Sequence, residues 1–161
     1  MDFLAASQGI NKPQWFGNKD EVVFCWAEEG LGDEVMAASC LDELSCRMER
    51  LIVSADRRLL PIFKRSFTNI QFICRDDNYH SLAFDSQIPS MTALGMLRPS
   101  VGSFKVAARG YLTPNETLVN QLRGKIKDIA GDSPIIGISW KTAAAVTGKK
   151  RSIDLRTFLR G

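Results

Sequence analysis

Carboxylates gather around two glycines in one short stretch near the start of the chain, comprising Glu28, Glu29, Gly30, Gly32, Asp33 and Glu34. Like charges held this close raise one another's pKa, and a raised carboxylate pKa suits a general base. The glycines permit positive φ or a close backbone approach, and the amides that open a helix favour an anion. An acid at a helix start is also a common N-cap, so Asp33 has a structural interpretation beside the catalytic one.

A second group of residues with binding chemistry lies near the end of the chain. Residues 141–161 carry six basic side chains and one acidic one, whereas residues 1–140 have a net charge of −2. This local positive field favours a small anionic ligand over nucleic acid, although a solvated charged run has the same composition. Arginine contacts phosphate in a bidentate manner and lysine acts as a point charge, so this loop could hold a diphosphate. The candidates are Trp140, Lys141, Lys149, Lys150, Arg151 and Ser152.

Cysteine and histidine usage argues against several other kinds of site. The four cysteines show no C-x-x-C spacing and His80 is the single histidine, so we expect neither a metal site nor a paired redox motif, and no cofactor. Buried reduced thiols indicate a cytoplasmic protein. No apolar stretch reaches about 18 residues and the first ten residues lack a basic flank, so we expect no membrane span and no secretion signal.

We call residues 28–34 the acidic turn. The elements that must position it follow an alternating pattern. Residues 22–27, 51–55 and 70–74 are apolar runs of strand length, and residues 34–46 and 57–67 between them have helical periodicity. This βαβαβ order predicts an α/β fold, a Rossmann-like parallel sheet flanked by helices. The acidic turn then lies at the carboxyl end of the first strand, where open parallel sheets bind ligands.

The second half of the chain is less regular. We expect a short strand near 82–84 and a short helix over 90–97, amid prolines and glycines. Thr113, Pro114 and Glu116 provide helix-start signals for a helix that ends at Gly131. Residues 134–140 read as a further buried strand, and a new helix begins near Ile153.

Four segments of the sequence carry recognisable motifs: residues 13–17 (PQWFG), 26–34 (WAEEGLGDE), 136–141 (IGISWK) and 150–153 (KRSI). Together they resemble the glycosyltransferase-like domains that follow tetratricopeptide repeats in many bacterial proteins. These domains are relatives of heptosyltransferases and, more remotely, of O-linked N-acetylglucosamine transferases. The first two segments resemble the family motifs P-x-W-x-G and W-x-E-Q-G-[LI]-G-D-E, although Glu29 stands in place of the usual Gln. The last two resemble the G-[IL]-S-W and R-S segments that open the second lobe.

The resemblance implies a GT-B enzyme with two Rossmann-like lobes and no obligatory metal. By motif position, Asp33 inherits the role of the base that deprotonates the acceptor hydroxyl, and the surrounding acids and glycines lie on the acceptor side. The cations near the chain end would face the phosphates of a nucleotide-sugar donor. The implied organisation is an N-terminal segment (1–20), the acceptor-side lobe (21–133) and the truncated start of the donor-side lobe (134–161). Because a fragment cannot position both substrates, we expect it to be inactive alone.

Two alternatives remain open from the sequence. The chain could be a non-catalytic Rossmann-like module that binds a glycan or a protein. It could also bind a nucleotide or S-adenosylmethionine, but Asp56, the only acid near the ribose-binding position, lies one step beyond the second strand. The expected partners are a nucleotide-sugar donor and a glycan or protein acceptor. A homodimer could form through apolar surface near residues 135–140 if the lobe is truncated.

Overall fold

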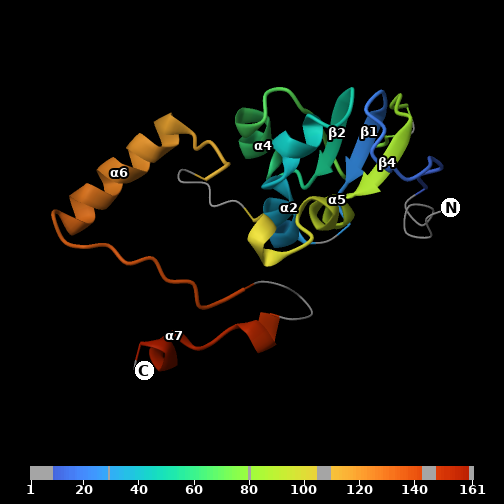
Figure 1. The fold of residues 1–161 in the computed structure, drawn as a ribbon. Helices are drawn as coiled ribbons and strands as arrows, with labels where there is room; N and C mark the ends of the chain where they lie inside the picture. The colour runs from blue at the N-terminus through green and yellow to red at the C-terminus, as the bar shows by residue number, and fades with distance from the viewer. Residues whose placement is uncertain (1–8, 29, 80, 105–109, 143–147, 160–161) are drawn as a thin grey trace. The chain divides into compact units, whose positions relative to one another are not determined.

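The computed structural model describes residues 9–28, 30–79, 81–104, 110–142 and 148–159 (Figure 1). The chain forms two compact units, residues 1–115 and residues 116–161. The lobe boundary expected at residue 133 stays a prediction.

The first unit is built on a four-stranded parallel sheet of order β3-β2-β1-β4. Its strands are β1 (Val22–Trp26), β2 (Arg50–Ala55), β3 (Gln71–Cys74) and β4 (Ser86–Pro89). The chain runs outward from β1 to β3 and then returns to the other side of β1 at β4. The predicted α/β, Rossmann-like class is therefore confirmed, and the strand order reverses between β1 and β4.

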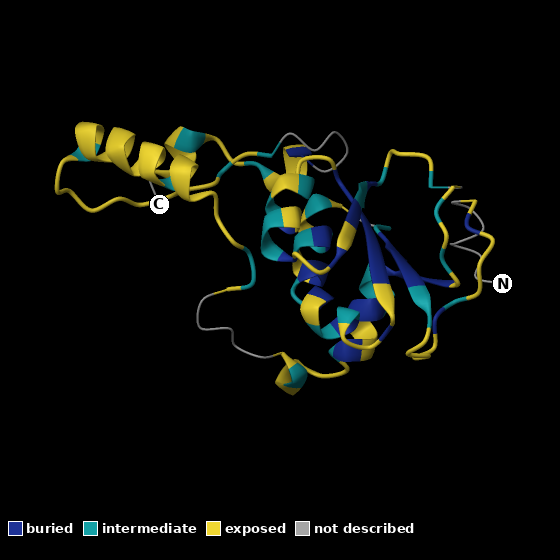
Figure 2. Ribbon diagram, turned by 90° about the horizontal axis from the view of Figure 1, so that it is seen from above, coloured by how far each residue is buried: buried dark blue, intermediate teal, exposed yellow. Residues whose placement is uncertain are grey.

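Helices cover one face of this sheet, and irregular segments cover the other (Figure 2). The helices are α2 (Leu31–Ala38), α3 (Leu41–Ser45), α4 (Leu60–Ser66) and α5 (Ser90–Leu97). Beneath them lies the main core, in which Phe63 packs against Phe67 and Phe72. On the opposite face, Phe24 lies 5.2 Å from Tyr79 and 5.1 Å from Phe84 between ring centroids. The second face is therefore closed by loop side chains.

The N-terminal segment hydrogen-bonds to the outer side of β4. The amide of Gln87 donates to the carbonyl of Pro13 at 2.9 Å, and the amide of Trp15 donates to the carbonyl of Gln87 at 2.8 Å. A parallel β-bridge joins Gln14 to Gln87. Trp15 is buried, and its indole nitrogen donates to the carbonyl of Asn18 at 2.8 Å. Residues 13–15 thus pair with β4 without forming a full strand.

Two expected elements of the first unit differ from those observed, and one strand was not expected. The helix expected over 34–46 is two helices, because the chain turns at Ser39, whose hydroxyl donates to the carbonyl of Met36. The short strand expected at 82–84 is wrong, since Leu82 and Phe84 pack as irregular chain over Phe24. The fourth strand lies at 86–89 instead. Its polar Ser86 and Gln87 and its proline do not resemble a strand in sequence.

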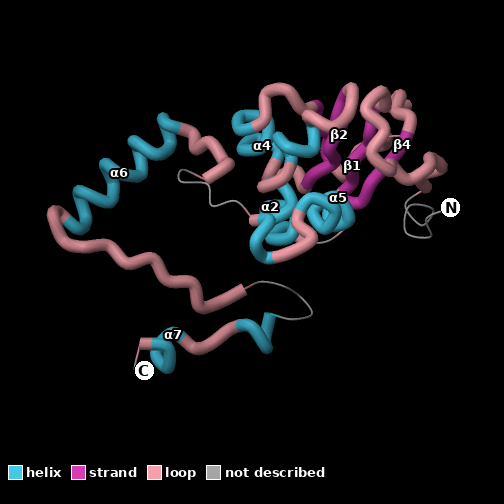
Figure 3. The backbone as a smooth tube through the Cα atoms, in the orientation of Figure 1, coloured by secondary structure: helices cyan, strands magenta, loops and turns pink. Residues whose placement is uncertain are grey.

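The second unit contains α6 (Glu116–Ala130), a 3₁₀ helix at Gly148–Arg151 and α7 (Leu155–Phe158) (Figure 3). The helix stop at Gly131 is confirmed, since this residue has φ of 57° and donates to the carbonyl of Lys127. Residues 134–140 are not a strand in the structure, because no described residue pairs with them as a neighbouring strand. Consequently Ile135 and Ile136 are exposed.

Candidate functional site

The acidic turn lies at the carboxyl end of β1, beside the point where the strand order reverses. Gly30 is the N-cap of α2, and its carbonyl accepts the amides of Asp33 at 3.0 Å and Glu34 at 3.1 Å. Gly30 has φ of −79°, and Gly32 is not among the glycines with positive φ. A Cβ at Gly32 would meet no atom within 4 Å. Gly32 therefore leaves open space beside the turn, and neither Gly30 nor Gly32 has a positive φ.

Asp33 occupies the third position of α2 and is half-buried. Its side chain makes no capping hydrogen bond, so the N-cap interpretation of this residue is wrong. Within the described part of the chain, its carboxylate has no hydrogen bond or ion pair. It lies close to Gly30, where an added Cβ would stand 3.5 Å from Oδ2. The carboxylate is thus held at the turn without an internal partner there.

Glu34 has the opposite environment, because its side chain is only 3% exposed. Its Oε2 accepts the amide of Asp56 at 2.7 Å, and its Oε1 pairs with Nη1 of Arg75 at 2.8 Å. Burial raises the pKa of Glu34, while the Asp56 amide and the Arg75 guanidinium oppose that rise. Glu34 therefore ties α2 to the ends of the neighbouring strands from inside the fold.

A network of charges continues across the carboxyl ends of β2 and β3. Arg75 directly follows β3, and its Nη2 lies 3.2 Å from Oδ2 of Asp56, the residue that follows β2. Arg58 donates from Nε and Nη2 to the two oxygens of Asp56 at 2.9 and 2.8 Å. The hydrogen bonds from Arg58 are the main reason that the pKa of Asp56 lies well below its usual range. The sequence pattern predicted no role for either arginine, although Arg75 directly follows β3 and Arg58 lies two residues after Asp56.

A polar cavity of about 290 Å³ opens at this same edge of the sheet. We call it the polar cavity. Its lining comes from the ends of β1, β2 and β3 and the segments that follow them, and includes Trp26, Glu28, Ser54, Arg75, Asp76 and Tyr79. The hydroxyl oxygen of Ser54 accepts the amide of Ala27 at 3.1 Å and so fixes the start of the acidic turn. The predicted acceptor residue Glu28 thus lines a cavity together with Ser54 of β2 and with residues that directly follow β3.

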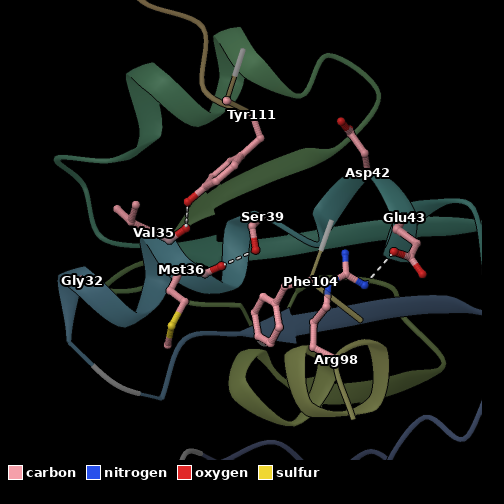
Figure 4. Close-up of a pocket in the computed structure, with 10 residues that line it drawn as sticks. Gly32, Val35, Met36, Ser39, Asp42, Glu43, Arg98, Phe104 and Tyr111 are labelled. Carbon is pink, nitrogen blue, oxygen red and sulfur yellow. Dashed lines mark hydrogen bonds and ion pairs between the residues drawn. The ribbon is translucent and has the colours of Figure 1, made fainter. Parts of the chain in front are cut away.

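A larger cavity of about 670 Å³ lies on the outer side of α2 and is mainly apolar (Figure 4). Gly32, Met36, Phe104 and Tyr111 are among its lining residues. The hydroxyl of Tyr111 donates to the carbonyl of Val35 at 2.8 Å. The predicted acceptor residues Glu28 and Gly32 therefore border different cavities, on two sides of the turn.

At one end of this apolar cavity, Arg98 pairs with Glu43 at 2.8 Å. The guanidinium of Arg98 is the first cause that lowers the pKa of Glu43, and Arg47 adds to it. Both oxygens of Glu43 are engaged, since Oε1 pairs with Arg47 at 2.8 Å. The ion pair therefore joins α3 to the end of α5.

Cys25 lies beneath the turn and is buried. Burial, with a smaller contribution from the charge of Glu28, raises the pKa of its thiol to about 12. A thiol with this pKa is protonated at neutral pH, and the thiolate is the reactive form. Cys25 therefore belongs to the core and is unsuited to nucleophilic chemistry.

The second unit brings the two predicted donor-side segments together. The amide of Ile153 donates to the carbonyl of Trp140 at 3.0 Å, and the amide of Thr142 donates to the hydroxyl oxygen of Ser152 at 3.1 Å. Lys141, Lys149, Lys150 and Arg151 are all exposed. The cations thus flank one local arrangement, consistent with a surface loop and with an anion site.

Glu29 and His80 lie outside the described residues.

Two kinds of feature are absent from the described residues. No group of three or more His, Cys, Asp or Glu side chains in the described ranges is arranged to hold a metal ion. Likewise, none of the helices in that part of the chain combines the length and apolar character that crossing a membrane requires.

Comparison with known proteins gave one weak similarity. The chain is 24% identical to protein FlbA of Caulobacter vibrioides, in a match that covers 71% of this chain and 22% of FlbA. The chain therefore corresponds to about a fifth of the length of that relative. No family model matches the chain, and no solved structure matches it. The fold and the arrangement of the turn are consequently the basis for any functional conclusion.

Proposed function

We propose that the first unit is the acceptor-binding lobe of a metal-independent glycosyltransferase, which uses a nucleotide-sugar donor. The observation that carries this proposal is the environment of Asp33. This carboxylate lies at the carboxyl end of β1, next to the reversal of strand order, and has no partner among the described residues. Its neighbour Glu34 is buried and paired. A base at a ligand-binding edge needs an accessible carboxylate, and Asp33 meets that requirement.

The proposed reaction is a displacement at the anomeric carbon of the donor sugar. Asp33 accepts the proton of the acceptor hydroxyl while the hydroxyl oxygen forms a bond to that carbon. The bond from the anomeric carbon to the diphosphate oxygen breaks, and the nucleoside diphosphate leaves with the electron pair. Lys141 and Arg151, with Trp140, Lys149, Lys150 and Ser152, are the proposed donor-phosphate contacts.

The donor half of the site must be complete for transfer, because chemistry requires both substrates in one geometry. The isolated chain of 161 residues is therefore proposed to bind acceptor without transferring sugar. A cytoplasmic setting suits the proposal, since all four cysteines are free thiols and a reducing compartment keeps them so.

The test measures sugar transfer by the complete gene product that contains this chain. Purified protein is mixed with radiolabelled nucleotide sugars and an extract of the source organism from which the gene has been deleted. Incorporation of label into acceptor is then measured. Asp33→Asn should reduce the rate by about 10²- to 10⁴-fold, the usual contribution of a general base.

Asp20→Asn is the matched control, since Asp20 is an exposed carboxylate at the opposite end of β1. It should transfer sugar at the wild-type rate, and circular dichroism should show both variants to be folded. Undiminished transfer by Asp33→Asn would exclude this residue as the base. Saturable glycan binding without transfer by the complete gene product would instead favour the non-catalytic binding module.

A further inference from the structure

The polar cavity presents hydrogen-bonding groups of both kinds from three separate strand ends. Glu28 and Asp76 supply carboxylate acceptors, and Arg75 supplies guanidinium donors. Ser54, whose oxygen already accepts the amide of Ala27, retains its hydroxyl hydrogen as a donor. Donors and acceptors interleaved around one cavity suit a ligand whose groups can do both, as hydroxyls do.

The guanidinium of Arg75 is held in place before any ligand arrives. Nη1 pairs with the buried carboxylate of Glu34, and Nη2 pairs with Asp56, which Arg58 also contacts. Its orientation is thus fixed by these two carboxylates. A preorganised donor loses less entropy when a ligand binds. Trp26 is also fixed, because its indole nitrogen donates to Oε1 of Gln87 at 2.5 Å.

The charges at this cavity select against anions. The positive charge of Arg75 is already matched by Glu34 and Asp56, whereas Glu28 and Asp76 add two carboxylates to the lining. A phosphate or carboxylate placed there would face these like charges at short range. The cavity therefore favours a neutral ligand over an anion, in contrast to the basic loop in the second unit.

The volume of the cavity restricts the ligand further. At about 290 Å³ it lies at the lower end of ligand-binding pockets, which span about 300–1,000 Å³. A single ring fits this space better than a whole nucleotide. Trp26 and Tyr79 add aromatic surface to the polar lining.

We infer that the polar cavity binds one neutral sugar ring of the acceptor, through Glu28, Ser54, Arg75 and Asp76. This inference rests on the proposed function, because it names the chemical class of the acceptor of that lobe. Binding itself requires neither the donor nor Asp33, so it is measurable on the chain alone.

The experiment titrates the full chain with neutral sugars and with anionic counterparts, observed by ¹H–¹⁵N NMR. The neutral probes are glucose, galactose, mannose and N-acetylglucosamine, and the anionic probes are glucuronate and glucose 6-phosphate. Titrations extend to about 50 mM, since a single ring with few contacts binds in the millimolar range. At least one neutral probe should shift the Trp26 indole and Asp76 amide signals to saturation, with anionic probes at least about tenfold weaker.

Variants test the residues that define this selectivity. Glu28→Gln should weaken neutral-sugar binding by about tenfold, the effect of losing one charged hydrogen bond, and should narrow the gap between neutral and anionic probes. Asp76→Asn, at an exposed position, should act in the same direction and protects the test if Glu28→Gln does not fold. Asp20→Asn, at the other end of β1, should bind as wild type does.

Three outcomes would overturn the inference: no neutral probe saturates the signals, anionic probes bind equally well, or the shifts map to Met36 and Tyr111 at the apolar cavity. Failure of this inference is distinct from failure of the proposed function. If the chain binds a neutral sugar and Asp33→Asn leaves transfer intact, the inferred sugar site is supported and the proposed role of Asp33 as the base is refuted. Transfer that depends on Asp33 without sugar binding by the chain refutes the cavity alone.

Discussion

Replacing Arg75 with methionine removes the cation that pairs with the buried carboxylate of Glu34, while keeping an apolar stem of similar length. Breaking a buried ion pair by removing one partner costs about 3–5 kcal/mol. The Arg75 side chain is 35% exposed, so water can replace part of the stabilisation that it gives to the Glu34 carboxylate. We therefore expect a smaller loss of unfolding free energy, about 2–3 kcal/mol. The Asp56 amide remains as a donor to Glu34.

The pH dependence of this loss identifies its cause. The pKa of Glu34 is already raised by burial above its ordinary value of 4.5, and removing Arg75 raises it further. A carboxyl group with a raised folded-state pKa favours folding below its unfolded-state pKa, and that contribution is lost as the pH rises through the folded-state value. The destabilisation of Arg75→Met should therefore be largest near pH 8 and shrink as the pH approaches 4.5.

Urea unfolding followed by far-ultraviolet circular dichroism measures the effect. At pH 8 the midpoint should fall by about 1–2 M, given a typical urea dependence of about 1–3 kcal/mol per M. The double variant Glu34→Gln with Arg75→Met should recover about 1 kcal/mol or more, because Gln can still accept the Asp56 amide without a charge. A loss that is independent of pH, or is not relieved by Glu34→Gln, would refute the view that an uncompensated Glu34 charge is responsible.

Two further predictions concern other parts of the first unit. Brief treatment of the native protein with iodoacetamide at pH 8 should label the exposed Cys46 and leave Cys25 unlabelled. The thiol of Cys25, with a pKa of about 12, has a thiolate fraction of only about 10⁻⁴ at that pH. Comparable labelling of Cys25, detected by mass spectrometry, would contradict its burial. Tyr111→Phe should lower the unfolding free energy by about 1 kcal/mol through loss of the bond to the Val35 carbonyl, and unchanged urea stability would show that this bond contributes nothing.

The parallel sheet was predictable because three of its strands are continuous apolar runs. Strands β1, β2 and β3 are buried along most of their length, and such strands need apolar residues on both faces. The fourth strand was not predictable from its composition. Gln87 is fully buried there, with its side-chain oxygen bonded to the Trp26 indole and its backbone bonded to residues 13 and 15. Those bonds come from segments distant in sequence, so local pattern carried no sign of them.

The candidate site shows the same division between local and distant information. The sequence places acids at a turn that follows a strand, and the structure agrees with that location. Motif position singles out Asp33, but residue type alone does not distinguish it from the adjacent, chemically similar Glu34. Their environments differ because Glu34 is buried and pairs with Arg75, 41 positions away. Sequence spacing likewise missed the role of Arg75, since its partners come from α2 and the end of β2.

The pairing of residues 13–15 with β4 has a practical consequence for handling the protein. An edge strand with open backbone groups is a template for pairing with other chains, and residues 13–15 occupy part of that edge through the bonds to Gln87. Trimming an expressed polypeptide to the apparent start of the sheet at Val22 would uncover this edge and remove Trp15 from the core. Such a shortened chain should be prone to self-association, so a domain boundary for expression belongs before Pro13 rather than at the first strand.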